Sequence, residues 1–318
     1  MGMRARNRKL FAAVENAYNT PAAVVASDAV RTSGLEIIRY GGERVSQDYN
    51  RAGLGNDRMI NVNPHAGLSA FRVPFVGSGS TNTPPAWAAL LQACAVAETD
   101  DTATNDAWYY TPVDTDFDSV TCIVAEELIQ QQIVGVRGNF GIEANPGALP
   151  VFTFSNWLGS YARPVALALD DPNDTAYKDA VPVTFSNTTT LTVGGVAYPV
   201  SGFTFDAGNT VTRLNQPNRL ETVIEDRRPS GTIIVSPAEV ADIIALFAGI
   251  ESHESQTDTP IVLKHGSGAG SILRLDIYAA NIGEMTDQVV AGETYFSLPF
   301  NVVPDALGEE WRLTQAAS

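Results

Sequence analysis

The sequence predicts a mainly β protein with two tandem antiparallel β-sandwich or barrel domains, each with one flanking α-helix. Three observations lead to this prediction. Many segments alternate apolar with polar residues, two segments have a helical apolar period, and the strands and helix recur in the same order. The 318 residues, 44% hydrophobic and 18% charged, are enough for two cores of ordinary size.

The opening strand of each predicted domain carries the first sign of a repeat. SGLEIIRYGGERVSQ from Ser33 and SGFTFDAGNTVTR from Ser201 both begin with Ser-Gly and break at a glycine before resuming at Val45 or Val211. From this repeat we expect an N-terminal arm at 1–29, a first domain at 30–163, a linker at 164–199, a second domain at 200–305 and a C-terminal tail at 306–318. The linker contains a predicted small hairpin around Gly194-Gly195.

A helix is predicted in the same place in both domains. TPPAWAALLQACA starts at Thr83 and SPAEVADIIALFA starts at Ser236, each with a hydroxyl residue for the N-cap and a proline in the first turn. The apolar residues recur at i, i+3, i+4 and i+7, which indicates one buried face. These residues are Trp87, Leu90, Leu91 and Cys94 in the first segment, and Val240, Ile243, Ile244 and Phe247 in the second.

A hairpin and an aromatic strand are predicted after each helix. The first hairpin joins SVTCIVA to LIQQQIVGVRGNF through Glu126-Glu127, and the second joins PIVLKH to SILRLDIY through GSGAG. The closing strands are GALPVFTFSNW from Gly147 and GETYFSLPF from Gly292. The shared order favours a tandem duplication over convergent β patterning.

Charge and hydropathy exclude several classes of protein. Twenty Lys and Arg against 36 Asp and Glu give a formal net charge of −16, which repels nucleic acid phosphates. No apolar run is long enough to insert into a membrane, and no cleavage site follows the basic N-terminus, so we expect folding in the cytoplasm. Cys94 and Cys122 lie in apolar surroundings typical of reduced, buried thiols.

No residue pattern indicates a catalytic, cofactor-binding or metal site, so we expect no enzyme and no cofactor. His65, His253 and His265 lack metal-ligand spacing. DTDFD from Asp114 opens like a calcium loop but then lacks the required glycine and glutamate. HGSGAGS is followed by a strand instead of a helix, so a hairpin turn is favoured over a phosphate loop.

Three segments in order resemble the major tail tube protein of long, non-contractile-tailed (siphophage-like) bacteriophages. They are RKLFAAVENAYNTPAA, FVGSGSTNTPPAWAALLQACAVAE, and ILRLDIYAANIG with FSLPFNVVP. Two positions depart from the family pattern. Asn19 replaces a glycine, and asparagine tolerates positive φ, so the turn can survive. Ala95 replaces another glycine, and we expect the helix to run one residue further there.

The resemblance implies a structural virion protein. Tail tube proteins fold as two packed antiparallel sheets and join edge to edge into stacked rings. Single-domain members form six-membered rings, so two domains in one chain predict a homotrimer with pseudo-sixfold symmetry. DNA would pass through an acidic lumen during genome ejection without specific binding. Implied partners are further copies of the chain, a tape-measure protein in the lumen, a tail terminator and distal tail or baseplate proteins, in a virion tail assembled in the host cytoplasm.

Two long segments, Gln47–Asn61 and Arg213–Arg227, correspond to the inter-ring contact element of the family. Both mix charges with apolar residues, which suits an exposed loop that is buried on stacking; a flexible surface hairpin is the alternative. The candidate contact residues are Arg51, Leu54, Asp57, Arg58, Met59, Arg219, Leu220, Glu221, Val223 and Arg227. The basic N-terminal arm around Arg4–Arg8 is expected to dock on a neighbouring ring.

Two other functions are compatible with a β-rich chain. A phage decoration, baseplate or adhesin-like protein would bind a partner or glycan through exposed aromatic residues, for which Trp108-Tyr109-Tyr110 is the candidate. A carbohydrate hydrolase would need two opposed carboxylates, and adjacent pairs such as Glu309-Glu310 point apart on a strand.

Overall fold

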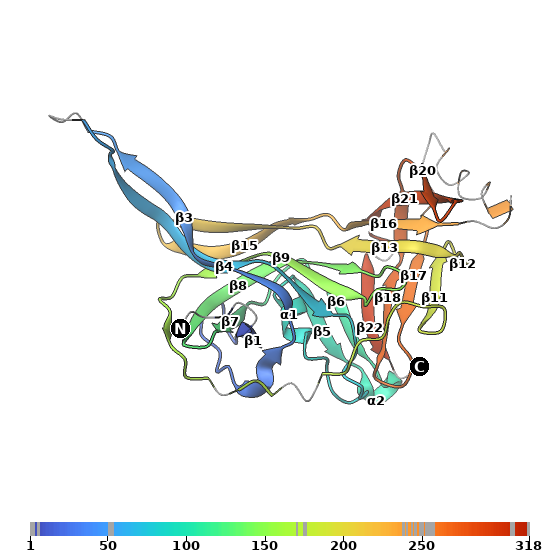
Figure 1. The fold of residues 1–318 in the computed structure, drawn as a ribbon, viewed down its shortest axis with the longest axis horizontal. Coiled ribbons are helices and arrows are strands. Elements are labelled where there is room, and N and C mark those ends of the chain that lie inside the picture. Colours follow the sequence, from blue (N-terminus) through green and yellow to red (C-terminus); the bar gives the residue numbers. More distant parts are fainter. Residues whose placement is uncertain are drawn as a thin grey trace.

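Antiparallel strands make up most of the chain, which confirms the predicted mainly β class (Figure 1). The structure is a computed structural model that describes residues 4, 7–49, 54–169, 171–173, 177–236, 239, 241–242, 244, 247, 251, 258–305 and 309–316. Every strand pair within these residues is antiparallel.

The elements of the first half follow the predicted order. They are β1 (Lys9–Val14), a 3-10 turn (Ala26–Asp28), β2 (Ala29–Val30), β3 (Ser33–Gln47), β4 (Arg58–Pro74), α1 (Ala88–Gln92), β5 (Val96–Asp100), α2 (Thr102–Asn105), β6 (Trp108–Pro112), β7 (Val120–Ala125), β8 (Ile129–Glu143), β9 (Val151–Ser160) and β10 (Val165–Ala166).

The second half adds β11 (Thr188–Val193), β12 (Val196–Ala197), β13 (Val200–Asp206), β14 (Asn209–Gln216), β15 (Arg219–Arg227), β16 (Ser230–Val235), β17 (Ile261–His265), β18 (Ile272–Ile277), β19 (Ala279–Ile282), β20 (Thr286–Val290), β21 (Glu293–Val303) and β22 (Trp311–Ala316). The predicted hairpins β7–β8, β11–β12 and β17–β18 are confirmed by their pairing.

Two large sheets contain strands from both halves of the chain. Within the described residues, a 13-stranded sheet has the central order β19-β21-β16-β13-β8-β7-β1-β2, with β3, β4, β9, β10 and β20 attached to it. A 7-stranded sheet has the order β12-β11-β17-β18-β22-β6-β5, and β14 and β15 form a separate two-stranded ribbon. The halves are therefore joined by hydrogen bonds in both sheets.

Aromatic side chains fill the space between these sheets. Trp311 of β22 contacts Phe140 of β8 and Phe205 of β13, with ring centroids 5.7 and 5.6 Å apart. Trp87 contacts Phe152 at 4.8 Å, and both rings are fully buried. Burying aromatic rings from both halves in one core makes the halves depend on each other for stability.

The first helix is shorter than the sequence predicts. Its apolar face is buried as expected, since Trp87, Leu90, Leu91 and Cys94 are almost fully inaccessible. The expectation that the helix runs one residue further, to Ala95, is wrong. The helix ends at Gln92, and Ala95 has φ 59°, the left-handed conformation that glycine favours. The second predicted helix, from Ser236, lies mostly outside the described residues.

Segments at both ends of the chain contribute strands. Lys9–Val14 pairs with β7, and Leu10 and Phe11 are fully buried. Arg8 forms an ion pair with the buried Glu126 at 2.7 Å. At the other end, β22 lies between β18 and β6 and so connects strands of the two halves.

Candidate assembly interface

Two strands at the margin of the 13-stranded sheet, β3 and β19, have equivalent places in the strand order of the two halves. In the first half the strands lie in the order β3-β4-β9-β8, and in the second half in the order β13-β16-β21-β19. Within the part of the chain that the structure describes, β3 pairs with no strand but β4, whereas β19 pairs with β21 and its Ala280 also exchanges two backbone hydrogen bonds with Thr259. Unpaired strand edges are templates for the addition of another strand.

Strands β8 and β13 form the junction between the halves. Thr204, Phe205 and Asp206 lie opposite Glu143, Ile142 and Gly141. The junction therefore pairs β8, the last strand in the order of the first half, with β13, the first strand of the second half.

Glycine at position 141 allows this close approach. A Cβ atom there would lie 2.6 Å from the carbonyl oxygen of Phe205 and 2.8 Å from Oγ1 of Thr153. Both distances are shorter than real Cβ contacts, so any side chain at this position would push β13 away.

Asn139 holds the end of β13 at this junction. Its Nδ2 donates to Oδ1 of Asp206 at 2.7 Å, and its Oδ1 accepts from the backbone N–H of Asn209 at 2.9 Å. Asn209 in turn donates to the carbonyl oxygens of Cys94 and Gly138. These bonds satisfy buried polar groups and fix where β13 ends and β14 begins.

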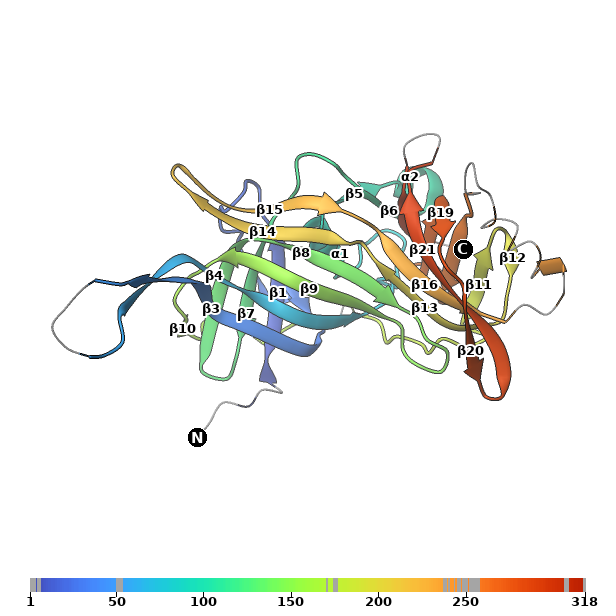
Figure 2. The same ribbon diagram turned by 90° about the horizontal axis from the view of Figure 1, so that it is seen from above.

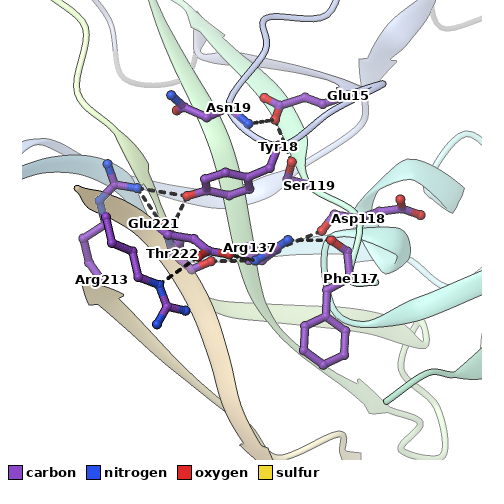
Figure 3. A network of polar contacts seen from close by, with 11 residues as sticks. Glu15, Tyr18, Asn19, Phe117, Asp118, Ser119, Arg137, Arg213, Glu221 and Thr222 are labelled. Carbon is purple, nitrogen blue, oxygen red and sulfur yellow. Dashed lines mark hydrogen bonds and ion pairs between the residues drawn. The ribbon is translucent and has the colours of Figure 1, made fainter. Parts of the chain in front are cut away.

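The ribbon of β14 and β15 lies across β8 and β9 of the first half, and a buried arginine holds it there (Figure 3). Arg137 of β8 donates to the carbonyl oxygens of Phe117, Asp118 and Thr222 and forms an ion pair with Glu221 at 3.1 Å. Its guanidinium also lies 4.7 Å from the centre of the Tyr18 ring. This one side chain connects three segments that are distant in the sequence.

The opening motif of the sequence supplies the rest of this network (Figure 3). The Tyr18 hydroxyl accepts from the N–H of Thr222 at 2.5 Å and from Arg213 at 3.2 Å. The buried Glu15 carboxylate accepts from the N–H groups of Asn19 and Gly135 and from two hydroxyl groups, those of Ser119 and Thr121. Asn19 has φ 58°, so asparagine adopts the turn expected at this position. The motif residues thus position the ribbon.

The electrostatics of the network follow from burial. Burial raises the pKa of Asp118, and the neighbouring Arg137 acts in the opposite direction. Burial raises the pKa of the Cys94 and Cys122 thiols, so both stay in the thiol form at neutral pH.

The hairpin of β3 and β4 extends away from the body of the molecule (Figures 1 and 2). It carries large apolar side chains that are exposed in the single chain: Tyr40, Val45, Tyr49, Leu54, Met59, Ile60 and Val62. The β14–β15 ribbon extends toward the same side and is shorter (Figure 2). The two are linked by a hydrogen bond from Nδ2 of Asn63 on β4 to the Arg213 carbonyl on β14, at 2.8 Å.

The structure places the predicted inter-ring residues on these two hairpins. Arg51 lies outside the described residues, Leu54 is fully exposed, Asp57 precedes β4, and Arg58 and Met59 begin it. Arg219, Leu220, Glu221, Val223 and Arg227 all lie on β15.

Two of these residues make contacts within the chain that the sequence did not indicate. Glu221 pairs with Arg137 and Arg219. Arg227 binds both carboxylate oxygens of Glu310 and the carbonyl oxygen of Val113. Leu220 and Met59 remain exposed.

The aromatic cluster proposed for partner binding lies on β6. Tyr110 is fully buried against Trp87, and its hydroxyl donates to Glu98 at 2.9 Å. Burial raises the pKa of Tyr110, and the adjacent Glu98 raises it further. The Nε1 of Trp108 donates to the Thr81 carbonyl. The cluster is therefore packed into the fold.

Comparison with known proteins identifies the family. Among the described residues, no helix is both long and apolar enough to span a bilayer. No curated protein matches the chain. The family model described as phage tail tube protein matches residues 5–302, nearly the whole sequence. The chain therefore belongs to the phage tail tube protein family, and it is a structural component of a phage tail.

Proposed function

We propose that three copies of the chain close into a ring of six tube modules, and that rings stack into a tube that conducts DNA into the host. The observation that supports this proposal most directly is the β8–β13 junction, which joins two modules edge to edge within one chain. Within the described residues β3 pairs with β4 alone. In the strand order, β3 has the place in the first module that β13 has in the second, and β19 has the place in the second that β8 has in the first. Pairing between copies at these edges is heterologous and closes a cyclic ring.

The equal strand order of the two halves supports a tandem duplication with modules at 30–163 and 200–305. The negative net charge supports a lumen that repels phosphates, so that DNA slides without binding. A tape-measure protein inside the lumen, a terminator and distal tail proteins are the partners such a tube requires. Assembly in the host cytoplasm and a role without catalysis complete the proposal.

Contacts between rings are assigned to the tips of the two hairpins. Met59, Leu54 and Leu220 are exposed there and suit burial on stacking. Arg227 forms an ion pair with Glu310 at the base of the ribbon, and Glu221, next to Leu220, forms one with Arg137.

Negative-stain electron microscopy and mass photometry of the purified protein test the proposal. The expected particle has the mass of three 33.9 kDa chains, with six lobes and end-to-end stacking. Shortening the segment Gln47–Asn61 to a tight turn should leave rings that no longer stack. Six chains in each ring would refute the trimer, and normal tubes from the shortened variant would refute the inter-ring assignment.

A further inference from the structure

The hairpin of β20 and β21 projects from the second half of the molecule (Figure 2). Its two-residue turn consists of Ala291 and Gly292, both with positive φ. Among the described residues β20 pairs with β21 alone, and no other backbone hydrogen bond reaches Thr286–Val290. Four of its five residues are exposed, and Val289 is 74% exposed. In the described part of the chain the outer edge of β20 is therefore open to a further strand.

The β20–β21 hairpin is also acidic. From Gly283 to Val303 the sequence contains Glu284, Asp287 and Glu293 and no lysine or arginine. All three carboxylates are exposed, and none forms an ion pair or a side-chain hydrogen bond with another described residue. Because these like charges repel one another, a cationic neighbour would be attracted to this hairpin.

Residues 1–8, the basic segment, precede β1 and have the opposite charge. They contain Arg4, Arg6 and Arg8 and no Asp or Glu. Arg8 is fixed to the molecule by its ion pair with the buried Glu126 at 2.7 Å. Arg4 is exposed, and its guanidinium has no ion-pair partner among the described residues. The residues ahead of Arg8 can span about 20 Å when extended, which is enough to pair with a strand of the length of β20.

Strands β1 and β20 lie on different sides of one chain. β1, which follows the basic segment, is on the side of the first half, and β20 is on the side of the second half (Figures 1 and 2). In a ring with head-to-tail contacts, the second half of one copy faces the first half of the next. The basic segment of one copy and the β20 edge of its neighbour are thus brought to the same contact between copies.

We propose that the basic segment of one copy adds as a strand to the outer edge of β20 in the neighbouring copy of the ring, with Arg4 and Arg6 paired to the carboxylates of the β20–β21 hairpin. Backbone hydrogen bonds along the edge hold the added strand, and the carboxylates select a basic one. The inference rests on the proposed ring, and it assigns the surface on which the N-terminal arm docks.

A charge swap in the full chain tests this contact. The pair Arg4→Glu, Arg6→Glu and the pair Asp287→Arg, Glu293→Arg should each raise the ring-forming concentration at least about tenfold, because like charges then face each other. The two pairs combined should restore ring formation to near the wild-type concentration. Arg4, Asp287 and Glu293 have no ion pair within the described chain, so the unassembled variants should melt at the wild-type temperature. Unchanged ring formation in either pair, or no recovery in the combination, would overturn the proposal.

A matched control changes acidic residues away from the β20–β21 hairpin. Glu225→Arg, Asp258→Arg alters two exposed carboxylates of the second half by the same charge. Combined with Arg4→Glu, Arg6→Glu, it should leave ring formation as weak as in the arginine variant alone. Recovery in this control would mean that net charge, and not docking at β20, governs assembly, and the proposal would fail.

Crosslinking identifies the strand that occupies the edge. The Arg4→Cys, Gln288→Cys double variant, treated with a short bismaleimide, should give covalent dimers and closed trimers on a denaturing gel, since the native Cys94 and Cys122 are buried and should not react. With Ser33→Cys on β3 in place of Arg4→Cys the chain should stay monomeric, and crosslinks through Ser33→Cys alone would overturn the proposal. Wild-type rings without the expected crosslinks would refute only the named contact, whereas wild-type protein that forms no rings would refute the proposed function and the contact together.

Discussion

The β14–β15 ribbon and the outer part of the β3–β4 hairpin are similar in sequence pattern but have different surroundings. The ribbon lies over β8 and β9, where Arg137 and Tyr18 bind its backbone and its own Arg213 donates to the Ser160 hydroxyl of β9. The β3–β4 hairpin projects from the molecule with its apolar side chains exposed (Figure 2). The ribbon has a preceding half of the chain to lie on, and the first hairpin has none. A neighbouring copy would supply that surface in a ring.

The largest expected effect concerns the arginine that holds the ribbon. Arg137→Met leaves the carbonyl oxygens of Phe117, Asp118 and Thr222 without their donor and Glu221 without its buried partner. We expect a loss of about 3 kcal/mol in the free energy of unfolding. Urea unfolding of the unassembled chain measures it. Arg228→Met, at an exposed arginine that pairs with Asp226, should cause no measurable change. Equal losses in the two variants would contradict the assigned role.

An isoleucine on each hairpin provides a direct comparison. Ile224 on β15 is buried, with 9% of its surface exposed, whereas Ile60 on β4 is 49% exposed. Ile224→Ala should destabilise the unassembled chain by about 2 kcal/mol, because it leaves a cavity. Ile60→Ala should change the free energy of unfolding by less than about 0.5 kcal/mol. If Ile60→Ala is as costly in the unassembled chain, the first hairpin is already packed without a neighbour.

The smallest expected effect depends on pH. The pKa of Asp118 is raised in the folded chain, so its ionised form is disfavoured there, and stability falls as pH rises through that pKa. Asp118→Asn removes this ionisation and keeps the backbone carbonyl that Arg137 uses. At neutral pH the variant should melt at most about 1 °C higher than wild type, since the carboxylate is partly solvated. The difference should vanish below the ordinary pKa of 3.8, and a difference that persists there would point to packing.

Local sequence patterns predicted most strands of this protein. Apolar alternation located β7, β8, β17 and β18, because a strand with one buried face has a period of two residues. Helical spacing located the buried face of α1. The end of that helix was missed, because a left-handed alanine leaves no mark in the sequence.

The interface was less predictable. The hairpin residues were located, but the internal roles of Glu221 and Arg227 depend on Arg137 and Glu310, far away in sequence. The conformation of Asn19 was foreseen from the tolerance of asparagine for positive φ.

By itself the sequence determined the antiparallel strands, the buried helix face and the resemblance to tail tube proteins, because these depend on residues close together in the chain. Only the tertiary structure decided that the halves share both sheets and that β14 and β15 are held by Arg137. Pairing between distant strands depends on which edges meet in space, and local periodicity carries no record of that.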